Sequence, residues 1–391
     1  MMCIIVGKNF VSEEKTIFRR ATLASVITST YPMIVVGCYF GITPWNMNRL
    51  SIDESDLSYA MLLFGIFFII SNQIAGRILV PKYGTKSVMA FSFPLIAFST
   101  FLSIISPSYF YFLLSSIPTG IGWGASGPIG GIHTQLVEKK FKKIVTPYYA
   151  MGFSIGMLVG GTLAGFIMRN NYEPYISFAF LSVFSILVAM LVYYLGLPRD
   201  LDFKGEGEKF KIPEGKILLF GFLLFFVFGS SGILMDWSTL WLSKDLGAPL
   251  HLASTGLIFL SVGSIFANLL SNTLIDIFTE KVVGCYFIMF GAIIMFLVLL
   301  TNNFYIILVM FGIYGFSSAN FVPIIIRQAV KQSSESIPMT VTNLITIGLS
   351  STMILPAGIG FLAETYSLTL NMYLLTFVVF TCAVIFLFKY K

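Results

Sequence analysis

The sequence has few of the charged residues that a water-soluble protein needs. Only 11% of its 391 residues are charged, and 57% are hydrophobic. A soluble protein carries about 25% charged residues and about 45–50% apolar ones. No soluble domain could bury so much apolar surface, so the chain must lie in lipid. This composition excludes a soluble enzyme, a nucleic-acid-binding protein and a secreted disulfide scaffold.

Cysteine and histidine, the usual ligands of structural zinc, are also scarce. The only histidines are His133 and His251, far apart in the sequence, and no CxxC pair is present. The four cysteines are equally dispersed: Cys3, Cys38, Cys285 and Cys382. We therefore expect no zinc site, no disulfide framework and no cofactor. The N-terminus has no cleavage site after a short apolar core, which predicts that the first apolar stretch stays as a membrane helix.

Long apolar runs are what the sequence does contain. A membrane helix requires about 20 mostly apolar residues. Between charged or turn-rich breaks, such runs lie near 21–43, 57–79, 87–105, 110–136, 145–168, 175–196, 216–242, 253–275, 282–301, 304–326, 338–362 and 371–388. The predicted fold is an all-α integral membrane protein with twelve transmembrane helices in two six-helix bundles. A porin-like barrel is excluded, because barrel strands are about ten residues long and alternate polar with apolar residues.

The basic residues orient these predicted spans. With the N-terminus in the cytoplasm, 21 of the 24 Lys and Arg residues fall on the cytoplasmic side. Only Arg49, Arg169 and Lys244 fall on the other side. Cytoplasmic loops of membrane proteins are enriched in Lys and Arg. The distribution predicts a multi-pass protein with both termini in the cytoplasm, and it explains the net charge of +6 without an anionic partner.

A polar, charged segment rich in Gly and Pro separates six predicted spans from the other six. The predicted organisation is a cytoplasmic tail (1–20), an N-terminal six-helix bundle (21–196), a central cytoplasmic loop (197–215), a C-terminal six-helix bundle (216–388) and a cytoplasmic C-terminus (389–391). The central loop is either a solvated linker or a regulatory docking segment.

Equal halves predict an internal duplication, as in many secondary transporters. Residues 120–140 and 312–332 share five identical positions at a fixed offset of 192. Glycines also recur at every fourth position in Gly152, Gly156 and Gly160. That spacing leaves one helix face without side chains, so another helix can approach closely. The face serves either static packing or sliding during a conformational change.

Two loops carry a degraded signature. Residues 76–86 read GRILVPKYGTK, and residues 272–281 read NTLIDIFTEK. In these loops the chain resembles the major facilitator superfamily, which places a Gly-x-x-x-Asp-Arg-x-Gly-Arg-Arg-like motif after its second and eighth helices. The first copy keeps Lys82, Gly84 and Lys86, and the second keeps Asp276.

The resemblance implies a role for these loops in gating. In the superfamily the segment pairs charges across the cytoplasmic gate and stabilises one access state. Here Pro81 stands where the first copy would have its acid. The predicted gating residues are Arg77, Lys82, Gly84 and Asp276. The alternative is that these residues only mark the cytoplasmic ends of helices.

Asp236 is the only acid well inside a predicted span. A carboxylate in lipid is costly, so it is expected to face the protein interior or a water-filled cavity. The Asp-Trp-Ser sequence at 236–238, together with Gln135 and Glu138, is similar to a bacterial branch of the superfamily related to sugar permeases. That branch has a Glu where Ser231 stands. Asp236 is either a coupling or substrate-binding residue, or an interfacial structural acid.

The resemblance implies which helices line the cavity, and in this sequence those helices carry neutral polar and aromatic groups. Together with the one acid, the candidate substrate-binding residues are Tyr31, Trp123, Ser126, Ser231, Asp236, Ser318 and Asn320. Hydroxyl, amide and aromatic groups suit a neutral polar or zwitterionic solute. The alternative is that several of them form hydrogen bonds between helices.

These observations predict a transporter of the bacterial inner membrane, not an enzyme. The expected partners are a small-molecule substrate, membrane lipid and, as a hypothesis resting on Asp236, protons; no nucleic acid and a monomer are expected. Two alternatives stay open. One is an exporter of a bulkier compound such as a drug or siderophore, because the glycine-rich helix resembles a helix found in exporters of the superfamily. The other is a transporter-like sensor or scaffold, which the degraded loop signatures favour.

Overall fold

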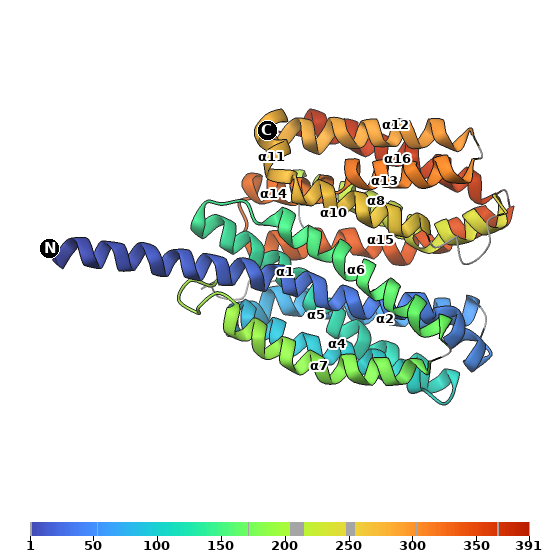
Figure 1. The fold of residues 1–391 in the computed structure, drawn as a ribbon, viewed down its shortest axis with the longest axis horizontal. Coiled ribbons are helices and arrows are strands. Elements are labelled where there is room, and N and C mark those ends of the chain that lie inside the picture. Colours follow the sequence, from blue (N-terminus) through green and yellow to red (C-terminus); the bar gives the residue numbers. More distant parts are fainter. Residues whose placement is uncertain are drawn as a thin grey trace. The chain divides into compact units, whose positions relative to one another are not determined.

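The computed structural model describes residues 2–52, 54–170, 172–203, 215–247, 255–301, 303–365 and 367–390. These residues are nearly all helical (Figure 1). The helices are α1 (Met2–Leu50), α2 (Glu54–Ile74), η1 (Ala75–Leu79), α3 (Val80–Tyr83), α4 (Thr85–Ile105), α5 (Tyr109–Phe141), α6 (Thr146–Arg169), α7 (Pro174–Leu195), α8 (Gly215–Lys244), α10 (Thr255–Leu269), α11 (Ser271–Phe278), η2 (Val282–Tyr286), α12 (Phe287–Leu299), α13 (Phe304–Ser318), α14 (Phe321–Gln332), α15 (Ile337–Thr365) and α16 (Leu368–Lys389). The two η segments are π-helices.

The chain divides into two compact units. Unit 1 comprises Met1–Ser51, Ile66–Phe210 and Ile337–Met339, and unit 2 comprises Ile52–Gly65, Lys211–Ser336 and Thr340–Lys391. In unit 1, α1 packs on α6, and α4 packs on α5 and α7. In unit 2, α10 packs on α13, and α12 packs on α16. The bundle boundaries expected from the sequence remain a prediction.

The predicted membrane spans fall on helices wherever the structure describes them. Nine described helical stretches are long and apolar enough to cross a membrane, and a bent pair, α10 with α11, would make a tenth. Large apolar side chains cover the outward faces, such as Phe377 and Phe388, which are 68% and 80% exposed. Such faces suit lipid rather than water. The count of twelve and the orientation remain predictions.

Glycines permit close helix contacts inside each unit. In unit 1, a Cβ atom built on Gly160 of α6 would lie 2.3 Å from the carbonyl oxygen of Ile34 in α1. In unit 2, a Cβ on Gly263 of α10 would lie 2.0 Å from the carbonyl oxygen of Gly312 in α13. The close approach predicted from the spacing of Gly152, Gly156 and Gly160 is therefore confirmed, and α1 is the helix that approaches.

Two turns, one in each unit, share an unusual backbone conformation. Gly84 joins α3 to α4 with φ 82° and ψ 162°. Thr279 ends α11 with φ 73° and ψ 153°. A side chain is strained in this region, so Thr279 shows that the turn is kept even without glycine. The two turns lie in the two loops with the degraded signature, which supports duplicated halves.

Candidate functional site

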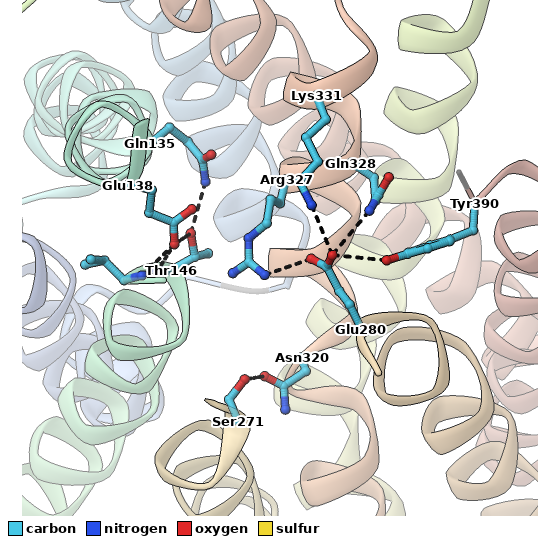
Figure 2. Close-up of polar contacts among 11 residues, drawn as sticks. Gln135, Glu138, Thr146, Ser271, Glu280, Asn320, Arg327, Gln328, Lys331 and Tyr390 are labelled. Carbon is cyan, nitrogen blue, oxygen red and sulfur yellow. Dashed lines mark hydrogen bonds and ion pairs between the residues drawn. The ribbon is translucent and has the colours of Figure 1, made fainter. Parts of the chain in front are cut away.

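One carboxylate in unit 2 accepts hydrogen bonds from four side chains. The carboxylate belongs to Glu280, and its Oε1 atom accepts from Nη1 of Arg327 at 2.7 Å. The Oε2 atom accepts from Nε2 of Gln328 at 3.3 Å, from Nζ of Lys331 at 3.1 Å and from the hydroxyl of Tyr390 at 3.0 Å. Figure 2 shows these four side chains converging on one carboxylate. We call the five residues the Glu280 cluster.

Three segments of the chain bring the Glu280 cluster together. The turn at Thr279 ends α11 and places Glu280 before η2. Arg327 and Lys331 are four residues apart on α14, so they lie on the same helix face. Tyr390 directly follows the end of α16. The cluster therefore fastens the turn after α11 to α14 and to the end of α16.

The core of the Glu280 cluster is an ion pair largely withdrawn from water. The side chains of Glu280 and Arg327 are 14% and 8% exposed, whereas Lys331 is 55% exposed. Burial alone raises the pKa of the Glu280 carboxyl, but the charges of Arg327 and Lys331 and their hydrogen bonds outweigh it and hold that pKa below its usual value. Glu280 is therefore an anion at neutral pH. Removing one partner from so buried a pair leaves an uncompensated charge.

A second carboxylate, in unit 1, holds the start of a helix. Oε1 of Glu138, near the end of α5, accepts from the backbone N–H of Val145 at 2.6 Å and of Thr146 at 2.7 Å. The hydroxyl of Thr146 donates to the same oxygen at 2.8 Å and accepts from Gln135 at 3.0 Å. A negative charge is favourable at a helix N-terminus. Glu138 thus fixes the α5–α6 turn (Figure 2).

The predicted gating residues occupy different surroundings. Arg77 is buried in η1, and its Nε donates to Oε1 of Gln73 at 2.6 Å. Lys82 is exposed beside the ring of Tyr83, and Gly84 forms the turn described above. Asp276 is exposed on α11, and within the described part of the chain no ion pair to it is found.

Sequence reasoning missed Glu280, four residues after Asp276. The usable signal was the alignment of the two loops. When Thr279 is matched to Gly84, the position after it, Glu280, corresponds to the first residue of α4. Arg327 and Lys331 were recognised only as cytoplasmic charges, although their four-residue spacing marks one charged helix face.

The predicted substrate-binding residues of unit 1 lie on α1 and α5. The hydroxyl of Tyr31 donates to the carbonyl oxygen of Leu181 at 2.5 Å, and its ring lies 5.9 Å from that of Phe93. Tyr31 is 4% exposed, so it packs inside the unit. Trp123 is half-buried and Ser126 is buried, one helical turn apart on α5.

The predicted substrate-binding residues of unit 2 lie on α8 and around the junction of α13 and α14. The hydroxyl of Ser231 donates to the carbonyl oxygen of Val227 at 2.9 Å. The helical backbone of Asp236 is described, but its side chain lies outside the described part of the structure. Ser318 is half-buried, and Asn320 is 2% exposed. Because these residues belong to two units, their convergence on one site remains a prediction.

Two helices of unit 2 break next to one another. The axes of α10 and α11 differ by 61° across Leu270, and α13 ends just before α14 begins. The hydroxyl of Ser271 donates to Oδ1 of Asn320 at 2.7 Å, and Nδ2 of Asn320 donates to the carbonyl oxygen of Ala267 at 3.4 Å. Asn320 therefore ties the two breaks together, as Figure 2 shows for its contact with Ser271. Broken helices are common around transporter binding sites.

Among the residues that the structure describes, no group of three or more His, Cys, Asp or Glu side chains is placed to hold a metal ion.

Comparison with known proteins identifies related membrane proteins. The model of the Major Facilitator Superfamily matches residues 25–259. An uncharacterized MFS-type transporter of Yersinia pestis is 22% identical over 338 residues, covering 84% of this chain and 85% of the relative. Membrane protein MosC of Rhizobium meliloti is 23% identical over 370 residues, covering 92% of this chain and 88% of MosC. The proton-coupled antiporter flippase LtaA of Staphylococcus epidermidis is 30% identical over 145 residues, which cover 37% of this chain and 35% of LtaA.

Solved structures share the fold along nearly the whole chain. The proton:xylose symporter XylE, bound to 6-bromo-6-deoxy-D-glucose, has a TM-score of 0.71 at 14% identity, covering 97% of this chain and 96% of XylE. The human organic anion transporter MFSD10 has a TM-score of 0.72 at 12% identity, covering 95% of this chain and 99% of MFSD10. At these identities the likeness concerns the fold.

Proposed function

This chain belongs to the major facilitator superfamily, and from that premise we propose that it moves a small polar organic solute across the bacterial inner membrane by alternating access. The chain is a membrane transporter and not an enzyme. In the proposed arrangement two six-helix bundles, with both termini in the cytoplasm, rock about a central site. The proposed protein is a monomer surrounded by lipid.

The Glu280 cluster is the observation that carries this proposal. Alternating access requires that the parts of each bundle keep their shape while the bundles move. An anionic Glu280 with the buried guanidinium of Arg327 at 2.7 Å forms such a fixed point in unit 2. We assign it the role of a clasp that holds the turn after α11 against α14. Arg77, Lys82, Gly84 and Asp276 remain the proposed gate residues of the two loops.

Proton coupling is proposed through Asp236. It is the only acid deep inside a predicted span, so a proton taken up there neutralises the most costly charge in the membrane. Two of the similar proteins, XylE and LtaA, are described as proton-coupled. Exchange of a proton at Asp236 would make solute movement depend on the pH gradient.

The proposed solute is neutral or zwitterionic. The proposed substrate-binding residues Tyr31, Trp123, Ser126, Ser231, Ser318 and Asn320 offer hydroxyl, amide and aromatic groups, and Asp236 adds one acid. XylE, described with a bound sugar, supports a polar solute. The match to the flippase LtaA, at 30% identity over 145 residues, favours export of a bulkier compound as the second candidate.

A thermal-unfolding screen of the detergent-purified protein tests the proposal. The panel holds sugars, amino acids, nucleosides, carboxylates and siderophores, each at two pH values. A ligand at 100 times its Kd adds about 2.7 kcal/mol to apparent stability. We expect a small polar solute to raise Tm, with a pH dependence that Asp236→Asn removes. Stabilisation by siderophores alone would favour the exporter, and a flat screen would favour the sensor; either contradicts the proposal.

A further inference from the structure

The residues that follow α7 are docked on unit 1 and are not a free linker there. Leu197 is fully buried among Ala21, Val137 and Val145. Its backbone N–H donates to Nε2 of His133 at 3.2 Å. The central loop thus begins as a fixed part of unit 1.

Asp202, a few residues further on, holds the start of α4. Its Oδ2 atom accepts from the backbone N–H of Thr85 at 2.7 Å and from the Thr85 hydroxyl at 3.0 Å. Its Oδ1 atom accepts from the N–H of Phe203 at 2.8 Å. Asp202 is 6% exposed, and its carboxylate lies at the positive end of the helix.

The contact depends on the turn at Gly84. A Cβ atom built at Gly84 would lie 2.7 Å from Oδ2 of Asp202, so only glycine leaves room for the carboxylate. Arg199 contacts the other end of the turn. Its Nη2 donates to the carbonyl oxygen of Pro81 and its Nη1 to the carbonyl oxygen of Phe203, each at 2.6 Å. The side chains of Asp202 and Arg199 therefore form hydrogen bonds to both ends of the α3–α4 turn.

His133 extends the same contacts to α1. Its Nδ1 atom lies 3.0 Å from the hydroxyl of Ser25, which also donates to the carbonyl oxygen of Ala21. Because Nε2 accepts from Leu197, Nδ1 carries the ring proton and donates to Ser25. One segment thereby links α1, α5 and the start of α4.

We propose that residues 197–203 form a strap which holds the α3–α4 turn in place, and that Asp202 is its positioning residue. The inference rests on the proposed function in one respect: the α3–α4 turn that the strap restrains belongs to a loop with a proposed gating role. A force or partner acting on the central loop is transmitted to Gly84 through Asp202 and Arg199.

Hydrogen–deuterium exchange on the full-length protein tests the strap directly. In wild type we expect protected amides at Thr85, Leu197 and Phe203. Asp202→Ala should accelerate exchange of these amides by about tenfold or more, while peptides from the middle of α7 keep their rate. Asp200→Ala, at an exposed neighbour of equal charge, should leave all rates unchanged.

A second variant and a second readout separate the strap from mere stability. Thr85→Val removes one donor and keeps the backbone N–H, so it should loosen the strap less than Asp202→Ala. With a solute identified, Asp202→Ala should change turnover in proteoliposomes at unchanged KM. If the strap amides of Asp202→Ala exchange at the wild-type rate, the docking is overturned. If they exchange faster but turnover is unchanged, the gating role of the strap is overturned. Absence of flux in wild type would count against the proposed function but leave the exchange result standing.

Discussion

At the scale of single residues, Glu280 illustrates how little of a charge network is visible in the sequence. The loop signature drew attention to Asp276, because that acid occupies the motif position. The structure instead uses Glu280, since the positive φ of Thr279 turns the chain before it. Backbone conformation at a non-glycine residue cannot be read from residue type, so only the alignment of Thr279 with Gly84 could have pointed to Glu280.

Replacing Glu280 by glutamine should destabilise the protein strongly. The variant keeps the shape of the side chain but removes the negative charge that faces the buried guanidinium of Arg327. Breaking a buried pair in this way costs about 3–5 kcal/mol. Thermal unfolding in detergent would show a much lower Tm. Lys331→Gln is the matched control, since Lys331 is 55% exposed and its pairing is worth at most about 1 kcal/mol. Equal losses in the two variants would contradict the clasp.

The Glu280 contribution should have a defined pH dependence. Its folded-state pKa lies below the ordinary value of 4.5 because of Arg327 and Lys331. A depressed carboxyl pKa stabilises the folded state above the unfolded pKa, and the effect is lost as pH falls through the folded pKa. The Tm difference between wild type and Glu280→Gln should therefore stay constant from pH 8 to pH 5.5, about one unit above the ordinary pKa, and shrink in more acidic buffer. A difference that changes near pH 7 would contradict this assignment.

At the scale of helices, the glycine spacing predicted a contact that the structure contains. Gly152, Gly156 and Gly160 meet α1 because a smooth face lets two backbones approach. The break after α10 could not be predicted in the same way, because Leu270 is neither a proline nor a glycine; there Asn320 donates to the carbonyl oxygen of Ala267. The break after α13 does have a signal in the sequence, since Pro323 in the first turn of α14 cannot donate to the carbonyl oxygen of Ala319.

Alanine at Gly160 should separate α1 from α6, whereas alanine at the next residue should not. The new Cβ at position 160 would lie 2.3 Å from the carbonyl oxygen of Ile34, and a backbone atom cannot rotate away. Overpacking of this kind costs about 1–3 kcal/mol. At Gly161 no heavy atom lies within 4 Å of the built Cβ, so alanine gains helix propensity of up to about 1 kcal/mol. Thermal unfolding of both variants would check this, and an equal loss at both positions would refute the packing argument.

At the scale of the whole molecule, composition predicted a helical membrane protein, and the resemblance of the two loop signatures indicated this superfamily. The prediction of an all-helical fold succeeded because lipid permits few architectures for a chain with 11% charged residues. The central loop, by contrast, could be described only as a linker or a docking segment. Residues 197–203 dock through contacts of Asp202 and Arg199 with α4 and the α3–α4 turn, distant in sequence, which no local pattern reveals.

Solute uptake into proteoliposomes under an imposed pH gradient tests the central claim most directly. The solute is the one that raises Tm in the screen, and the variants are Asp236→Asn and Glu173→Gln, an exposed acid outside the predicted spans. Wild type and Glu173→Gln should accumulate solute above its external concentration and lose it when a protonophore is added. Asp236→Asn should exchange solute without accumulating it. Accumulation by Asp236→Asn at the wild-type level, or no solute movement by wild type, would contradict the account.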